Sequence, residues 1–271
     1  MRSIKFAKLV CGGNDFIIID GRDRMPGGDL SALARSLCDR RSGVGADGLI
    51  IMVADDVFPF AMMLFNEDGS SAEVSYNGSR CVGLYASREG LTPENFRFAS
   101  KAGSVGVTVD GDEISLDIPA PQGFHTGMKV SAQDGEEVVG DLANVGIPYF
   151  VIFREDLEAG WVETVPPRLR TNKAFPSGTN VAVARPPEGG ICAARFFERG
   201  VAEETASSGS GCVAVALTAA LRFGANSPIT VRTEGGDFEI VFSRRDDNFT
   251  DILSASKVSY VFRGETADSG E

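Results

Sequence analysis

Two short stretches of this chain repeat one pattern, and the repeat constrains the fold more than any other feature. "SYNG" (residues 75–78) and "SGSG" (residues 208–211) each follow a β-like run and each open a helix made mainly of small residues. A chain that builds the same strand-to-helix junction in both halves is expected to form two similar units. The repeat therefore predicts an α+β fold with two pseudo-equivalent domains, whose helices present their N-termini to a shared cleft.

The best candidate for a domain boundary is the segment 120–127, "PQGFHTG" with its preceding alanine, which follows Pro119. We expect a first domain over residues 1–118 that recovers a C-terminal strand at about 257–263, and a second domain over residues 119–256. Residues 264–271 are expected to be a disordered acidic tail. His125 is the only histidine of the chain, and its position in this segment predicts an exposed linker residue.

Composition excludes several classes of function. The formal net charge is −12, which argues against nucleic acid or an anionic membrane as a partner. No apolar run approaches the roughly 18 residues needed to span a membrane. The five cysteines include no CxxC pair, so neither a disulfide framework nor a zinc site is expected. The N-terminus does not read as a signal peptide, and the expected location is the cytoplasm.

The two helix N-termini predict anion binding. The first turn of a helix offers unpaired backbone N–H groups and a partial positive charge, which together favour a carboxylate or phosphate. Two such N-termini facing one cleft would hold one anionic group and leave a side chain on either side of it. Ordinary serine N-caps are the alternative for either motif alone. Because the motif occurs in both halves, we favour the anion site.

One apparent nucleotide motif is rejected. Residues 43–48, "GVGADG", match the GxGxxG pattern, but a predicted helix precedes them and a predicted strand follows. The dinucleotide fingerprint requires the opposite order. The sequence shows no motif for a metal, flavin, pyridoxal phosphate or nucleotide, and we expect no cofactor.

The ordered motifs of the chain resemble those of the diaminopimelate epimerase family. The matching pieces span almost the whole sequence and read, in order, "GGNDFIIID", "RRSGVGADGLI", "LFNEDGSSAE", "NGSRC", "FPSGTNVAV", "FERG" and "GSG". The resemblance implies two pseudosymmetric domains, each a curled, mostly antiparallel sheet around a central helix. It also implies a cofactor-independent racemase or epimerase, in which two cysteines act as base and acid and helix N-termini hold the substrate carboxylate.

Carried over to this chain, the resemblance places the catalytic positions on Ser75 and Ser208, with Ser207 as the alternative for the second. The residues that match substrate-binding positions of the family or supply amides at the helix N-termini are Asn14, Asn66, Tyr76, Asn77, Gly78, Tyr149, Asn180, Glu198, Arg199, Gly209 and Ser210.

The departures from the family pattern bear on the reaction. Both cysteines are serine, a glutamine is Gly48, and the "GNPH" motif reads "GIPY" with Ile147 and Tyr149. Some of the polar side chains that would recognise the distal end of diaminopimelate are thus missing, and we expect a different substrate. A serine hydroxyl is a far weaker acid than a thiol and needs an adjacent base. Glu73 and Glu204 are the candidates by proximity in the sequence.

Three interpretations remain from the sequence. The preferred one is an isomerase-type enzyme that acts on a small amino acid or carboxylate, with Tyr76, Tyr149 or a carboxylate moving the proton. The second is a true epimerase carrying two engineered Cys-to-Ser substitutions. The third is a non-catalytic binder of an amino acid or dicarboxylate. A homodimer is possible under each, and no macromolecular partner is expected.

Overall fold

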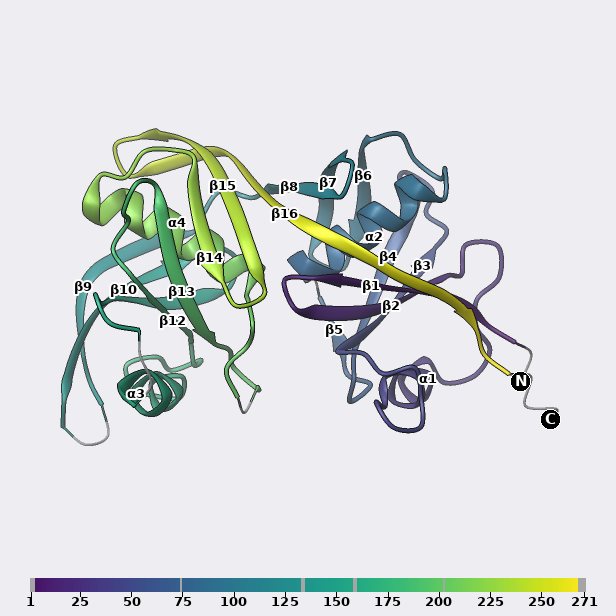
Figure 1. Cartoon of the computed structure of the whole chain (residues 1–271), viewed down its shortest axis with the longest axis horizontal. Coiled ribbons are helices and arrows are strands. Elements are labelled where there is room, and N and C mark those ends of the chain that lie inside the picture. The colour runs from purple at the N-terminus through teal and green to yellow at the C-terminus, as the bar shows by residue number, and fades with distance from the viewer. Residues whose placement is uncertain (1–2, 74, 133–134, 158–159, 202, 268–271) are drawn as a thin grey trace. The chain divides into compact units, whose positions relative to one another are not determined.

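The chain divides into two compact units, and one long strand runs from the second into the first. A computed structural model describes residues 3–73, 75–132, 135–157, 160–201 and 203–267 (Figure 1). Unit 1 comprises Met1–Asp117 with Ser256–Glu271, and unit 2 comprises Ile118–Ala255. The last strand, β16 (Asn248–Glu265), begins in unit 2 and ends in unit 1. No helix in the described part of the chain is both long enough and apolar enough to cross a membrane.

The sheet of unit 1 closes on itself. Its strands follow the order β1-β2-β3-β4-β6-β7-β8-β16, and β16 pairs again with β1, so the first and last members meet. The short strand β5 pairs with β4 outside this path. The bounds are β1 (Lys5–Cys11), β2 (Asn14–Asp20), β3 (Gly48–Val53), β4 (Ala61–Asn66), β5 (Ser71–Ala72), β6 (Asn95–Ser100), β7 (Gly103–Asp110) and β8 (Glu113–Ile118).

The central helix of unit 1 is α2 (Tyr76–Arg88). It packs against β1, β2 and β7, and most of its side chains are buried, including the fully buried Arg80. The second helix, α1 (Leu30–Cys38), starts at the N-cap Asp29, whose carboxylate accepts from Ser31 N. Its apolar face joins a core with the inner residues of β2 and β3, as the helical spacing of its leucines predicts.

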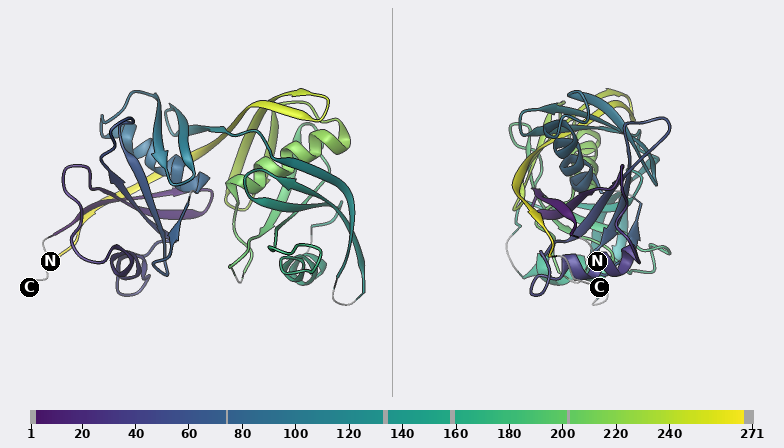
Figure 2. Two further views of the ribbon diagram at one scale, coloured as in Figure 1. Left: turned by 180° about the vertical axis from the view of Figure 1, so that it is seen from behind. Right: turned by 90° about the vertical axis from the view of Figure 1, so that its right-hand side faces the viewer.

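The sheet of unit 2 curls around α4 (Gly209–Phe223). Its strands follow the order β16-β15-β14-β13-β12-β11-β10-β9, and α4 contacts six of them, from β10 to β15. In Figure 2, α4 is the green helix among the strands of its own unit. The bounds are β9 (Gly123–Ser131), β10 (Glu137–Asn144), β11 (Pro148–Phe153), α3 (Trp161–Leu169), β12 (Asn180–Ala184), β13 (Ile191–Phe197), β14 (Ile229–Thr233) and β15 (Gly236–Arg245).

The topology repeats between the units. In unit 1, α1 connects the parallel strands β2 and β3, and α2 connects the parallel strands β4 and β6. In unit 2, α3 connects the parallel strands β11 and β12, and α4 connects the parallel strands β13 and β14. The other strand pairs for which the structure defines a register are antiparallel. The predicted fold class is therefore confirmed, with one helix inside the curl of each sheet.

Three local predictions are corrected. His125 is exposed as predicted but lies in β9, paired with Leu142, rather than in a linker. The stretch after β11 contains α3, which the sequence did not predict. The tail begins later than expected, because Phe6 pairs with Gly264 and Lys5 with Glu265. Residues 268–271, the rest of that predicted tail, lie outside the described residues.

Candidate active site

Ser208 caps the central helix of unit 2. Its backbone is extended, with φ −141° and ψ 115°, and its Oγ accepts a hydrogen bond from Gly211 N at 3.1 Å. This geometry is that of a serine N-cap, which satisfies one of the donors that the first helical turn leaves unpaired. The alternative residue, Ser207, precedes the cap and is buried. Ser208 is therefore the serine at the helix N-terminus.

A carboxylate and a phenol surround the Ser208 hydroxyl. Ser208 Oγ lies 2.6 Å from Glu198 Oε1 and 2.7 Å from Tyr149 Oη. Tyr149 Oη also lies 2.9 Å from Ser210 Oγ and 3.1 Å from Glu198 Oε1. Because an ionised carboxylate only accepts, the shortest contact is a hydrogen bond donated by Ser208 to Glu198. The single phenol proton of Tyr149 can be donated to Glu198 Oε1 or to Ser208 Oγ, and Ser210 can donate to Tyr149 Oη.

The interior of unit 2 keeps the phenol of this cluster protonated. Tyr149 is fully buried. Burial raises the pKa of Tyr149 well above its usual value, and the nearby Glu198 raises it further because a second negative charge would be repelled. At neutral pH the Tyr149 phenol is therefore a hydrogen-bond donor.

The structure gives Ser208 a different carboxylate from the one suggested by proximity in the sequence. Glu204 instead forms an ion pair with Arg195, through both carboxylate oxygens. Glu198 reaches Ser208 because β13 ends just before it and the chain returns antiparallel, with Thr205 N donating to Phe196 O at 3.0 Å. The resemblance assigned Glu198 to the substrate, whereas in the structure its carboxylate contacts Ser208 and Tyr149.

Ser75 caps the central helix of unit 1 in the same way. Its backbone is extended, with φ −129° and ψ 127°, and its Oγ accepts from Gly78 N at 3.1 Å. Among the described residues, this amide is the only recorded hydrogen-bond partner of the Ser75 side chain, so Glu73 makes no hydrogen bond to it. Tyr76, the first residue of α2, is half-buried, and burial raises the pKa of its phenol.

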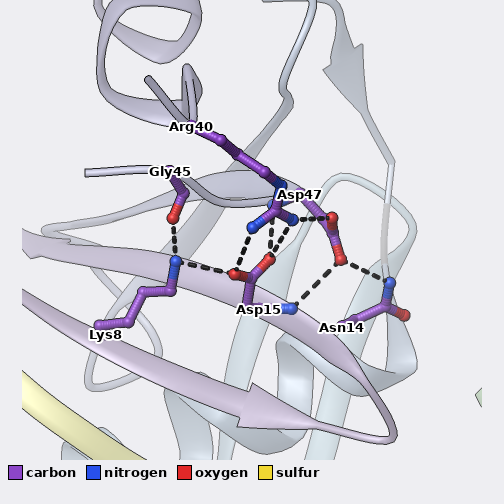
Figure 3. Close-up of polar contacts among 6 residues, drawn as sticks. All are labelled: Lys8, Asn14, Asp15, Arg40, Gly45 and Asp47. Atoms are coloured by element: carbon purple, nitrogen blue, oxygen red, sulfur yellow. Dashed lines mark hydrogen bonds and ion pairs between the residues drawn. The ribbon is translucent and has the colours of Figure 1, made fainter. Parts of the chain in front are cut away.

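A relay of two carboxamides leads from α2 to a charged network in unit 1. Figure 3 shows this network and the second carboxamide, Asn14. Asn77 Nδ2 donates to Asn14 Oδ1 at 2.8 Å, and Asn14 Nδ2 donates to Asp47 Oδ2 at 3.0 Å. Asp47 in turn accepts from Arg40 Nη2 at 2.6 Å. The structure thus joins two of the predicted binding residues, Asn14 and Asn77, in one hydrogen-bonded chain.

Asp15 is the second carboxylate of this network. It accepts a bidentate pair of hydrogen bonds from Arg40, at 2.9 and 3.0 Å, and Lys8 Nζ lies 2.8 Å from its Oδ2. Lys8 also contacts the carbonyl oxygen of Gly45. Burial by itself raises the pKa of Asp15, but the hydrogen bonds from Arg40 and Lys8 outweigh it and lower the pKa to about 2.

Three further predicted binding residues bond within their own unit. Asn66 Nδ2 donates to Ser70 Oγ at 2.9 Å in unit 1. In unit 2, Asn180 Oδ1 accepts from Arg199 N at 2.8 Å. The Arg199 guanidinium donates to Ser177 O at 2.8 Å. The Asn180 and Arg199 contacts link the loop before β12 to the turn that carries Glu198.

Packing accounts for the glycine that departs from the family pattern in unit 1. A Cβ atom on Gly48 would lie 3.0 Å from Phe65 O and 3.2 Å from the ring of Phe16. Both distances are shorter than ordinary van der Waals contact, so a larger side chain requires these neighbours to shift. In this chain, the glycine is therefore part of how β3 packs between β2 and β4.

Comparison with known proteins gives the family. The diaminopimelate epimerase family model matches residues 6–120 and 142–258. The diaminopimelate epimerase of Methanothrix thermoacetophila is 36% identical over 258 residues, covering 90% of each chain. That of Aquifex aeolicus is 32% identical over 278 residues, covering 98% of each.

Solved structures share the fold at low sequence identity. A phenazine biosynthesis protein of the PhzF family from Bacillus anthracis superposes with a TM-score of 0.76 at 14% identity, covering 99% of this chain and 100% of that one. A probable proline racemase from Agrobacterium radiobacter, solved with bound carbonate, gives 0.73 at 14% identity, covering 99% and 93%. Together with the match over both halves of the sequence, these findings show that the chain belongs to the diaminopimelate epimerase family of isomerases.

Proposed function

We propose that this chain is a cofactor-independent isomerase that moves a proton on a small amino acid or carboxylate other than diaminopimelate. The observation that carries the proposal is the 2.6 Å contact between Ser208 Oγ and Glu198 Oε1 at the N-terminus of α4. It gives a family member with serine in place of cysteine the adjacent base that a serine needs.

The Ser208–Glu198 pair can accept a proton without forming a free alkoxide. As Ser208 Oγ takes a proton from an activated carbon of the substrate, its own proton passes to Glu198 Oε1. The substrate becomes a carbanion or enolate, and the carboxylate becomes a carboxylic acid. Return of the proton to a different position of the substrate completes an isomerisation. Because Tyr149 remains protonated, it serves as a donor that stabilises charge on Ser208 as the proton moves.

The first turn of α4 supplies an acceptor site for the substrate carboxylate. Among the described residues, no acceptor is recorded for the backbone N–H groups of Gly209 and Ser210, the first two residues of the helix. Such groups at a helix N-terminus bind anions. We assign the substrate carboxylate to them, next to the hydroxyl that takes the proton.

The difference between the two serines favours chemistry with one base. Ser208 has a carboxylate partner, whereas the recorded partner of Ser75, within the described residues, is the Gly78 amide alone. A two-base racemase requires a second residue that can hold a proton, and Ser75 has no group to receive one. We therefore place proton removal and return at Ser208 and Glu198 in unit 2, and propose a separate role in anion binding, within unit 1, for the N-terminus of α2.

The test is solvent deuterium exchange followed by NMR in D₂O, over a panel of amino acids and small unsaturated acids. The unmodified chain is compared with Ser75→Cys/Ser208→Cys. We expect deuterium to enter a substrate of the unmodified chain, and Glu198→Gln to abolish that exchange. Glu239→Gln, an exposed position on β15, is the matched control.

Two other outcomes would change the assignment. Exchange confined to the double-cysteine variant would identify an epimerase disarmed at two positions. Silence in both chains, together with saturable binding of a panel member, would identify a non-catalytic amino acid or carboxylate binder and overturn the isomerase.

A further inference from the structure

The carboxamide relay of unit 1 has a single possible orientation. Exchange of the oxygen and nitrogen of an asparagine is normally settled by its hydrogen-bond partners. Here the partner of Asn14 is Oδ2 of Asp47, which also accepts from Asp15 N at 3.2 Å. The other carboxylate oxygen of Asp47, Oδ1, accepts a hydrogen bond from Arg40 Nη2. An ionised carboxylate has no proton to give. The Asn14 atom that faces Asp47 must therefore be Nδ2.

That orientation determines the other end of the relay. With Nδ2 toward Asp47, the oxygen of Asn14 faces Asn77, whose Nδ2 donates to it at 2.8 Å. Asn77 is the second residue of α2 and is buried beside the Ser75 cap. A carboxamide nitrogen carries two hydrogens, and one of those on Asn14 is used by Asp47. For the second, no acceptor is recorded among the described residues.

The charges behind Asp47 make the orientation hard to reverse. Arg40 bridges Asp47 and Asp15, and Lys8, whose side chain is 9% exposed, pairs with Asp15. Two cations and two carboxylates thus balance within this network. A reversed Asn14 would place its oxygen against Asp47 and its nitrogen against the nitrogen of Asn77, which breaks two hydrogen bonds at once.

We infer that Asp47 is a positioning residue, which fixes the Asn14 carboxamide so that Asn14 meets the ligand as a hydrogen-bond donor. This inference rests on the proposed function in one respect, the anion binding proposed at the N-terminus of α2, to which Asn14 is joined through Asn77. It specifies the chemistry of the ligand group, which is an acceptor such as a carboxylate oxygen and not an ammonium group. Asp47 acts through Asn14 and does not itself contact the ligand.

The test observes the side-chain NH₂ signals of Asn14 by NMR of protein labelled with ¹⁵N-asparagine. The Asn14→Asp variant, which lacks these signals, assigns them. We expect acetate to shift one Nδ2 proton of Asn14 and methylammonium to shift neither. In Asp47→Leu, the Asn14 signals should move and the acetate response should be lost. Asp47→Asn should retain the response, because its carboxamide oxygen can accept from Asn14 in place of Oδ2. Asp20→Leu, in the exposed Asp20–Arg22 pair at the end of β2, is the matched control.

Three results would overturn the inference. They are an unchanged Asn14 signal and acetate response in a folded Asp47→Leu, a shift caused by methylammonium instead of acetate, and the absence of any acetate response in the unmodified chain. If Asp47→Leu fails to fold, loss of the response in the conservative Asp47→Asn overturns it as well. None of these readings uses turnover, so an inactive chain with the expected NMR response would contradict the proposed function and leave the positioning role standing.

Discussion

The N-termini of α2 and α4 share one cap and differ in what surrounds it. Ser75 and Ser208 both have an extended backbone and both accept an amide hydrogen bond at 3.1 Å. Around Ser208, a carboxylate and a phenol contact the hydroxyl directly. In unit 1, the charged groups are connected to α2 indirectly, through the side chains of Asn14 and Asn77. We propose that the same local motif serves proton transfer in unit 2 and anion binding in unit 1.

The largest expected effect is at Glu198. Glu198→Gln keeps the shape of the side chain but removes the carboxylate that receives the Ser208 proton. We expect solvent exchange to fall at least ~100-fold, the lower end of what general acid–base catalysis contributes. The fall should appear in kcat, measured by deuterium incorporation at saturating substrate. Glu239→Gln should match the unmodified chain. Activity of Glu198→Gln equal to that of the unmodified chain would contradict proton transfer from Ser208 to Glu198.

Replacing each capping serine with alanine should lower the free energy of unfolding by a different amount at each position. Ser75→Ala loses an N-cap, which costs about 1 kcal/mol. Ser208→Ala loses the cap and also a partner of both Glu198 and Tyr149, so we expect about 2 kcal/mol. Chemical denaturation of both variants measures the difference, with Ser36→Ala, an exposed serine of α1, as control. Equal costs would show that the contacts around Ser208 add no stability.

Acid should weaken unit 1 through Asp15. Its pKa falls from 3.8 in the unfolded chain to about 2 in the folded one, so its contribution to stability is present above pH 4 and is lost as the pH falls through about 2. The shift corresponds to a free energy of unfolding on the order of 2 kcal/mol. Denaturation of the unmodified chain and of Asp15→Asn between pH 5 and pH 2 checks it. The variant should lose less stability over that range, and parallel curves would refute the assignment.

Alkali should act on unit 2 through Tyr149, with the smallest effect. Its pKa is raised in the folded state, so above the ordinary value near 10 the unfolded chain ionises first and stability falls as the pH rises. Tyr149→Phe should reduce that loss. The other three tyrosines also have raised pKa values, so the measurement is the difference between the two chains in denaturation at pH 9 and pH 11. An identical slope for both would exclude Tyr149 as a contributor.

Local sequence rules predict the two caps but not the partner of Ser208. In each motif, a serine precedes a glycine by three residues at the start of a small-residue helix, and in each the hydroxyl accepts from that glycine. Glu198 lies ten residues before Ser208 and reaches it through the antiparallel return after β13. Pairing at that distance depends on strand register, which a single sequence specifies weakly. The sequence predicts Glu198 as a substrate-binding residue, and Tyr149 as either a substrate-binding residue or a group that moves the proton.

Helix α3 is a part of the fold that the sequence did not predict, and its composition explains why. Pro166 and Pro167 lie inside it, and proline in a helix interior removes a hydrogen bond and is normally read as a breaker. The helix nevertheless buries Val162, Val165 and Leu169 against the core of unit 2. Burial of that face compensates for the weak local propensity. The topological repeat, in which α3 corresponds to α1, is the signal that could have located it.

The most direct test of the account compares Ser75→Ala with Ser208→Ala for deuterium exchange in the same substrate, at saturating concentration and with both variants shown to be folded. We expect Ser208→Ala to lose exchange at least ~100-fold and Ser75→Ala to keep a kcat close to that of the unmodified chain. Equal losses of kcat in the two variants, or exchange that survives in Ser208→Ala, would contradict the assignment of proton transfer to unit 2.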